Sequence, residues 1–252
     1  MAKVFQVDSG GTLTTGLVSY WKMDGSSTDF YDSNNGTDTS ITYSVANGKI
    51  SQGAGFNGTS SRIQVADNSN LTLGSSFSIA CWINVPSLPS NNAFYDILNK
   101  YDQGSNNGGY DLRLWNDNGT QKIGLVFIDS TSTQRGGDIA YTLSTNVWVH
   151  LVAVSNTSNS LITYYINGSS VGTITNNGAV PADNTKLLNI GNFGFYTPSG
   201  SELGRYFYGK IDEIGIWSKV LTTTEISDLY NNGNGQTMIE TTNTRRRLLL
   251  TM

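Results

Sequence analysis

The chain has 252 residues, of which only 13% are charged, and its formal net charge is −4. A mildly acidic chain argues against broad nucleic-acid binding, and no segment approaches the ~20 consecutive apolar residues that cross a bilayer. The single cysteine, Cys81, excludes an intramolecular disulfide.

Turn signals divide the chain into many short predicted strands. Asn-Gly occurs nine times, and this dipeptide favours type I′ hairpin turns because both residues tolerate positive φ. Residues 162–166 alternate before Asn167-Gly168, and residues 171–174 alternate after it. The sequence therefore predicts a hairpin with both arms visible.

Alternation is also clear in residues 77–83. It places Cys81 on the same face of a predicted strand as Phe77, Ile79 and Ile83. Free cysteine behaves as a small buried hydrophobe, so we expect Cys81 to be a structural thiol rather than a reactive one.

Residues 207–230 predict a strand, a turn and one short helix. Thr222 and Glu225 form a Thr-x-x-Glu capping box, in which each residue satisfies a free backbone donor of the other. The helix then presents one apolar face, made of Ile226, Leu229 and Tyr230.

This closing segment resembles the last strand and helical turn of laminin-G-like jelly-roll domains, in the concanavalin A-like lectin/glucanase superfamily. Further motifs resemble that family and follow in its order: 16–25, 32–37, 53–65, 77–85, 147–154 and 163–168. The resemblance implies an all-β, antiparallel two-sheet jelly-roll sandwich with one short C-terminal helix. We expect residues 1–15 to form an N-terminal arm, residues 16–232 the jelly roll, and residues 233–252 a C-terminal extension.

Catalysis is not expected. Glycosidases of this superfamily commonly carry Glu-x-Asp-x-Glu on one strand, and no Glu of this chain stands in that pattern. Asp212 and Glu213 are neighbours, so alternation predicts opposite faces, where they could not flank one sugar at ~5 to 9 Å. His150 is the only histidine, and we interpret it as structural because no nucleophile elbow accompanies it.

A structural calcium ion is the cofactor that the resemblance implies. Its side-chain ligands would be Asp24 and Asp212, helped by a backbone carbonyl near Asn57, with Asp32 in the first polar loop as a further candidate. Calcium prefers such oxygen ligands. The alternative is that Asp24 caps a turn and Asp212 is a solvated strand residue.

Aromatic residues in or beside polar loops are candidates for glycan binding, since sugar sites combine aromatic platforms with polar hydrogen-bonding groups. Aromatic residues also dominate protein interfaces, so the same rings could instead cover the ends of the sandwich or pack in an assembly. The candidate ligand-binding residues are Tyr101, Trp115, Phe193, Phe195 and Tyr196.

The chain carries no apolar stretch of signal-peptide length near its start. We expect a non-enzymatic structural or adhesive module on a phage virion surface, as a capsid decoration or fibre component that binds other particle subunits and cell-surface glycans weakly. The alternative is a secreted bacterial calcium-dependent lectin or adhesin, and a glycoside hydrolase or lyase is least favoured.

Both tails are expected to dock on neighbours in an assembly. Removing the C-terminal arginine cluster would leave the rest of the chain at −7 (−4 − 3), so this cluster could contact an acidic partner, although a solvated tail is the alternative. The expected assembly contacts are Phe5, Arg245, Arg246, Arg247, Leu248 and Leu249.

Overall fold

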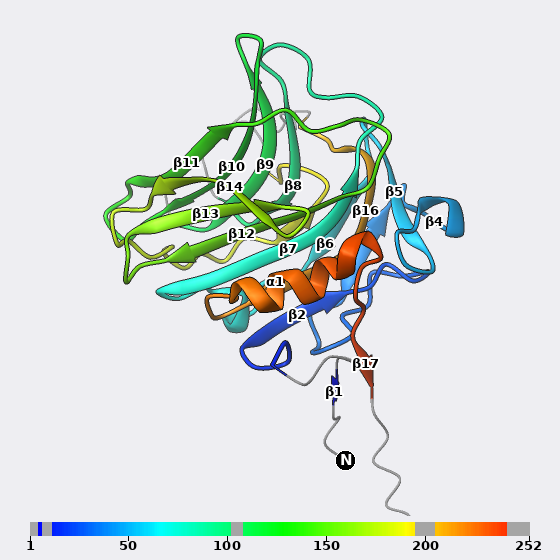
Figure 1. Ribbon diagram of the computed structural model, residues 1–252, viewed down its shortest axis with the longest axis horizontal. Coiled ribbons are helices and arrows are strands. Elements are labelled where there is room, and N and C mark those ends of the chain that lie inside the picture. Colours follow the sequence, from blue (N-terminus) through cyan, green and yellow to red (C-terminus); the bar gives the residue numbers. More distant parts are fainter. Residues whose placement is uncertain (1–4, 7–11, 102–107, 195–204, 241–252) are drawn as a thin grey trace, which may run out of the picture.

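The computed structural model describes residues 5–6, 12–101, 108–194 and 205–240, and two antiparallel sheets make up most of it (Figure 1). Within these ranges no helix has the length and apolar character needed to span a membrane. Among the expected site residues, Phe195, Tyr196, Arg245, Arg246, Arg247, Leu248 and Leu249 lie outside the described residues.

One sheet has seven strands in the order β11-β10-β9-β8-β15-β6-β3. Its strands are β11 Gln134–Ala140, β10 Thr120–Ile128, β9 Tyr110–Asp117, β8 Phe94–Asn99, β15 Leu188–Ile190, β6 Arg62–Val65 and β3 Gly36–Thr39.

The other sheet has eight strands, with β14-β13-β12-β7-β16-β5-β4 in a row and β2 paired to β16. Its strands are β14 Ser169–Thr175, β13 Leu161–Ile166, β12 Val149–Asn156, β7 Ser76–Asn84, β16 Tyr208–Trp217, β5 Gly53–Asn57, β4 Thr42–Ser44 and β2 Leu17–Trp21. Short 3-10 turns lie at η1 Val45–Asn47, η2 Ser69–Leu71 and η3 Asn231–Gly233. The predicted all-β sandwich is confirmed.

The main core lies between the two sheets. Strand β7 contributes Phe77, Ile79, Cys81 and Ile83, all fully buried in one cluster with inward residues of β9 and β10. Burial raises the pKa of the Cys81 thiol to about 12, which keeps it protonated. The predicted structural thiol is confirmed.

The predicted hairpin joins β13 to β14. Asn167 has φ 51° and Gly168 has φ 78°, so both turn residues adopt the positive φ that a type I′ turn requires. The Asn-Gly signal therefore identified a real turn.

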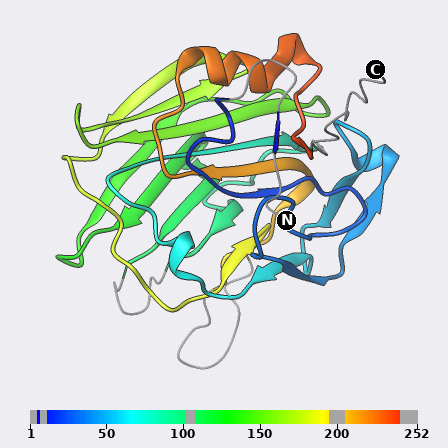
Figure 2. The ribbon, with the colours of Figure 1, turned by 90° about the horizontal axis from the view of Figure 1, so that it is seen from below.

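Helix α1 (Thr223–Tyr230) lies across the outer face of the eight-stranded sheet (Figure 1, Figure 2). The predicted capping box is present: the Glu225 N–H donates to Thr222 Oγ1 over 3.2 Å, and the Thr222 N–H donates to Glu225 Oε2 over 2.9 Å. Ile226 and Leu229 are buried beneath the helix.

The cluster beneath α1 also includes Leu13 and Met238, which are 1% and 0% exposed. Packed residues therefore extend beyond the span 16–232 expected for the jelly roll. Nearer the ends, β1 (Phe5–Gln6) pairs antiparallel with β17 (Ile239–Glu240), so the backbones of both tails lie side by side (Figure 1).

Strand β16 breaks the expected alternation at Asp212 and Glu213. Its register with β7 shifts between Asp212 and Gly215, and Glu213 has φ 49°, as in a β-bulge. Glu213 then accepts a hydrogen bond from the Tyr20 hydroxyl beneath α1. Burial raises the pKa of Glu213 to about 8, and the charge of Asp212 adds to this rise. The prediction that these two carboxyls point to opposite faces is wrong, because the bulge turns both outward.

An aromatic stack joins α1 to this sheet. The His150 ring on β12 lies 5.1 Å from Trp82 and 6.2 Å from Tyr230 of the helix, between ring centroids. His150 is 2% exposed, and its Nδ1 atom has no hydrogen-bond partner among the residues that the structure describes. Burial lowers the pKa of His150 to about 3, so the ring stays neutral in the folded state. The stack supports the structural role expected for this residue.

Because His150 is buried in its uncharged form, the free energy of unfolding depends on pH. An unfolded chain binds a proton at His150 below about pH 6.5, whereas the folded chain does not until about pH 3. The contribution of His150 therefore lowers the free energy of unfolding as the pH falls through 6.5. Between pH 7.5 and 5.0 we expect wild type to lose about 2 kcal/mol relative to His150→Phe, which keeps a stacking ring. Urea unfolding of both proteins at the two pH values measures this difference, and identical pH slopes would contradict it.

Candidate functional site

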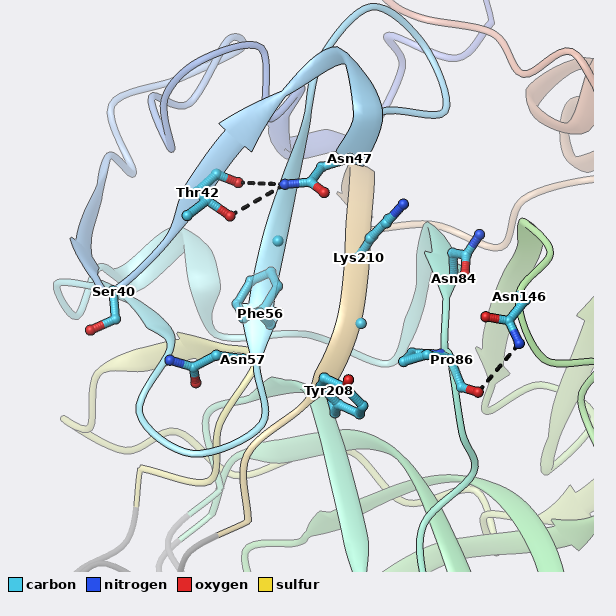
Figure 3. A pocket seen from close by; sticks show the side chains of 12 residues that line it. Ser40, Thr42, Asn47, Phe56, Asn57, Asn84, Pro86, Asn146, Tyr208 and Lys210 are labelled. Carbon is cyan, nitrogen blue, oxygen red and sulfur yellow. Dashed lines mark hydrogen bonds between the residues drawn. The ribbon is translucent and has the colours of Figure 1, made fainter.

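A cleft of about 460 Å³ opens on the outer face of the eight-stranded sheet, where β4, β5, β16 and β7 run side by side (Figure 3). Gly55, Asn84 and Lys210 of its lining face outward, because their neighbours Ala54, Ile83 and Ile211 are buried in the core, whereas the lining residue Phe56 belongs to that core. The lining residues are Ser40, Thr42, Asn47, Gly55, Phe56, Asn57, Asn84, Pro86, Asn146, Tyr208, Gly209 and Lys210.

Two glycines keep the cleft open. A Cβ atom at Gly55 would lie 2.6 Å from Asn47 Nδ2 and 2.7 Å from Thr42 Oγ1. Gly209 has φ +144°, and a Cβ there would collide with the Asn84 backbone carbonyl. Glycine is thus required at both positions for the strands and the η1 turn to approach this closely.

Strand pairing sets two rows of residues across the cleft. Lys210 on β16 pairs with Gly55 on one side and with Asn84 on the other. Tyr208, two residues earlier on the same face, pairs with Asn57. Residues two apart on a strand are separated by ~7 Å, so the Tyr208 ring and the Lys210 side chain are neighbours along β16 (Figure 3).

Some polar groups of the cleft are fixed by the fold, and others are unused. Asn47 Nδ2 donates to the Thr42 carbonyl over 3.0 Å, and the side-chain Oδ1 of Asn57 accepts from the backbone N–H groups of Thr59 and Ser60. By contrast, the Asn84 amide and the Tyr208 hydroxyl make no hydrogen bond within the described parts of the chain. The Tyr208 side chain is also 43% exposed.

The charge of the cleft lining comes from one residue. Lys210 is the sole charged residue among its lining residues. The Lys210 Nζ atom donates to the Ala46 carbonyl over 2.7 Å, and no described carboxylate lies within ion-pair distance of it. The cleft therefore combines one exposed ring, neutral amides and hydroxyls, and a single ammonium group.

The aromatic residues expected to bind ligand lie on the opposite sheet. Trp115 on β9 stacks on Phe94 of β8 with ring centroids 5.0 Å apart, and Tyr101 lies 6.3 Å from Phe193. Trp115 faces outward, since its neighbour Leu114 is in the core. The structure thus brings Tyr101, Trp115 and Phe193 to one region, as the glycan-site prediction requires, but away from the cleft.

Arginine side chains already occupy much of this aromatic surface. The Arg205 guanidinium lies 4.1 Å from the Phe94 centroid and 4.0 Å from the Phe193 centroid. Its Nε donates to Asp96 over 2.8 Å. Tyr101 and Phe193 are 8% and 1% exposed, so Trp115 and Phe94 are the rings that remain partly accessible.

The four residues expected to bind calcium do not converge. Asp24 Oδ1 accepts from the Gln52 N–H over 3.0 Å, and Asp212 Oδ2 accepts from the N–H groups of Lys49 and Ile50 over 2.7 and 2.9 Å. Asp32 instead accepts from Asn70. The described residues contain no group of three or more His, Cys, Asp or Glu suited to a metal ion.

Asp24 and Asp212 nevertheless lie close enough to interact. Burial raises the pKa of Asp212 to about 7, three backbone N–H donors oppose the rise, and the charge of Asp24 adds to it. A cation between the two carboxyls would relieve this repulsion. The pair therefore fits part of a calcium site, whereas Asp32 accepts from Asn70 instead. The backbone carbonyl near Asn57 stays a prediction.

The sequence did not single out the cleft, because its residues come from four strands that are distant along the chain. The available signal was the outward alternation of Tyr208 and Lys210 around Gly209. That signal identifies one strand face, but it does not reveal that β5 and β7 flank it.

Comparison with known proteins places this geometry in context. The chain is 25% identical over 177 residues to Paraclostridial mosquitocidal protein 1 of Paraclostridium bifermentans, covering 68% of this chain but 13% of that protein. The binding domain of the same toxin superposes with a TM-score of 0.66 at 21% identity, over 86% of this chain and 52% of that one.

Two other solved structures share the fold. Domain 4 of AbnA, a GH43 extracellular arabinanase from Geobacillus stearothermophilus solved with arabinotriose, gives a TM-score of 0.63 at 23% identity, covering 84% of this chain and 97% of that one. The botulinum neurotoxin serotype D binding domain gives 0.62 at 16% identity, over 86% and 51%.

A family model described as the concanavalin A-like lectin/glucanases superfamily matches residues 57–227. This range includes β5's last residue, the whole of β16 and most of α1, which are the elements that carry the cleft and its supporting helix. The family suggested by the sequence motifs is confirmed: the chain belongs to the laminin-G-like branch of the concanavalin A-like lectin/glucanase superfamily.

Proposed function

We propose that this protein is a non-enzymatic glycan-binding module and that the cleft between β4, β5, β16 and β7 is its binding site. The observation that carries the proposal is the exposed Tyr208 ring beside unused amide and hydroxyl groups. A sugar ring presents C–H groups to an aromatic face and hydroxyls to its surroundings, and such a lining satisfies both.

The comparisons support a binding role. The solved AbnA module was in complex with arabinotriose, and the mosquitocidal and neurotoxin structures are binding domains. Because these identities are below 25%, they show the shared fold, and the role of this chain rests on its own cleft.

The carboxyl groups argue against hydrolysis at this site. The cleft is lined by no Asp or Glu residue, whereas glycoside hydrolysis requires two carboxyls flanking the bond. Asp212 and Glu213 do lie on one face of β16, but they are 0% and 4% exposed and their oxygens bond the protein. We therefore infer binding without turnover.

Substitution of Tyr208 tests the site. Tyr208→Ala should lower the affinity for a retained oligosaccharide about tenfold, roughly 1.4 kcal/mol, because the stacking surface is lost. Trp115→Ala is the matched control, since it removes a partly exposed ring from the other sheet. Affinity electrophoresis on a polysaccharide panel, arabinan included, followed by calorimetry with the retained sugar, measures both variants. Loss of binding in Trp115→Ala alone would move the site to the seven-stranded sheet.

Calcium at Asp24 and Asp212 stays a prediction. The ion would be held by these two carboxyls and would tie the segment after β2 to β16, a structural role. We expect calcium to raise the melting temperature of wild type and to leave that of Asp24→Asn unchanged. Thermal unfolding with calcium and with EDTA checks this, and an EDTA-insensitive wild type would remove the site.

A virion setting also stays a prediction, with a secreted lectin as its alternative. The pairing of β1 with β17 brings both tails together, which would let them engage one neighbour. We expect the full chain to assemble and residues 12–238, which keep Leu13 and Met238, to be monomeric. Light scattering and electron microscopy of both would show this, and two monomers would contradict docking by the tails.

A further inference from the structure

We propose that the cleft selects acidic sugars, that is, glycans carrying a carboxylate, and that Lys210 and Asn84 together bind this carboxylate. The inference rests on the proposed glycan-binding function and adds the chemical class of the ligand. It follows from how strand pairing positions the single charge of the cleft.

The first step is the location of the charge. Lys210 lines the cleft, with Gly55 and Asn84 as its direct partners on the adjoining strands. On the β5 side, the neutral Asn47 and Thr42 side chains fill the space above Gly55, so no acidic side chain stands between Lys210 and that strand. Asn84 stands opposite, with its Cβ about 5 Å from that of Lys210 as in any directly paired residues.

The second step is the state of these groups. Lys210 Nζ uses one donor on the Ala46 carbonyl, which anchors the ammonium and leaves two N–H groups. No described Asp or Glu neutralises it, and none lines the cleft. The Asn84 amide makes no hydrogen bond within the described ranges. The fold thus provides a positioned cation and an unused amide donor side by side, a pairing suited to a carboxylate.

The third step is the distance to the aromatic ring. Tyr208 precedes Lys210 by two residues on the same strand face, so their side chains emerge ~7 Å apart. A pyranose stacked on the Tyr208 ring would direct a ring substituent toward Lys210. Asn57, paired with Tyr208, borders the other side of the same row.

The net charge of the protein does not oppose this selection. The formal charge is −4, but charges beyond about 8 Å are screened at physiological salt. The nearest acidic residue along the strand, Asp212, lies two residues from Lys210 on the same face, and its oxygens accept from the backbone N–H groups of Lys49, Ile50 and Glu213. Asp212 does not line the cleft, whereas Lys210 would contact the ligand directly. Arg113 and Arg205 on the other sheet differ from Lys210 because each is paired with Asp side chains.

The test compares ligands that differ only in charge. Galacturonic acid oligomers and their methyl esters form one pair, and sialyllactose and its methyl ester form the other, so the two sources of a sugar carboxylate are distinguished. We expect wild type to bind the acidic member of at least one pair about tenfold more tightly by calorimetry at low salt, and this preference should shrink as salt is added.

Variants assign the preference to its residues. Lys210→Gln should reduce the ratio of acidic to neutral affinity from about tenfold to about one, and Lys210→Arg should retain that ratio. Lys122→Gln is the control, since it removes an equal charge from the other sheet, where Lys122 pairs with Asp117. Tyr208→Ala should weaken both members of a pair. Thermal unfolding of each variant verifies that the fold is kept.

The outcomes separate the two proposals. Equal binding of acidic and neutral members, or a preference that survives Lys210→Gln, overturns the acidic-sugar inference, and sensitivity to Tyr208→Ala would still support the glycan-binding function. If wild type binds neither these four ligands nor any polysaccharide of the panel, both proposals fail.

Discussion

Strand β16 is the element on which the rest of the molecule depends. It pairs with β7 along one edge, and with β5 and then β2 along the other. Its inward residues Ile211, Ile214 and Ile216 are fully buried in the main core. Its outward residues have three different roles along the strand. Tyr208 and Lys210 line the cleft. Asp212 accepts a hydrogen bond from the turn that follows η1, and Trp217 packs beneath α1.

The bulge at Glu213 makes this division possible. Without the bulge, strict alternation from Ile211 onward would turn Ile214 and Ile216 outward and Trp217 inward. The bulge also brings two carboxyls to one face, where burial raises the pKa of Asp212 to about 7 and that of Glu213 to about 8. This arrangement is destabilising unless the groups are protonated or accept hydrogen bonds, and the N–H groups of Lys49 and Ile50 and the Tyr20 hydroxyl supply those bonds.

Features that depend on residues close together in the sequence were predicted correctly, whereas features that depend on pairing between distant strands were not. The capping box at Thr222 and the Asn167-Gly168 hairpin depend on residues a few positions apart, so their patterns predicted them correctly. The bulge at Glu213 left no local mark, since it reflects pairing with β7. The cleft draws on Gly55, Asn84 and Lys210 from three strands, and their adjacency exists only once the sheet order is known.

The two faces of the sandwich thus offer different chemistry. On the seven-stranded sheet, aromatic rings lie against guanidinium groups that are themselves paired with carboxylates, although the buried Trp115 Nε1 atom has no hydrogen-bond partner among the described residues. On the eight-stranded sheet, the Tyr208 hydroxyl and the Asn84 amide make no hydrogen bond within the described chain, and the Lys210 ammonium, bonded to the Ala46 carbonyl, keeps further N–H donors. Groups left without partners at an open site are the ones available to a ligand, which is why the cleft and not the aromatic cluster is the proposed site.

The most direct measurement is a chemical-shift titration of the isotope-labelled chain with an oligosaccharide that it retains. If the account is correct, the first signals to move are the side-chain amide of Asn84 and the backbone amides around Tyr208 and Lys210. Shifts that instead cluster at Phe94, Arg113 and Trp115 would contradict it and place the ligand on the seven-stranded sheet.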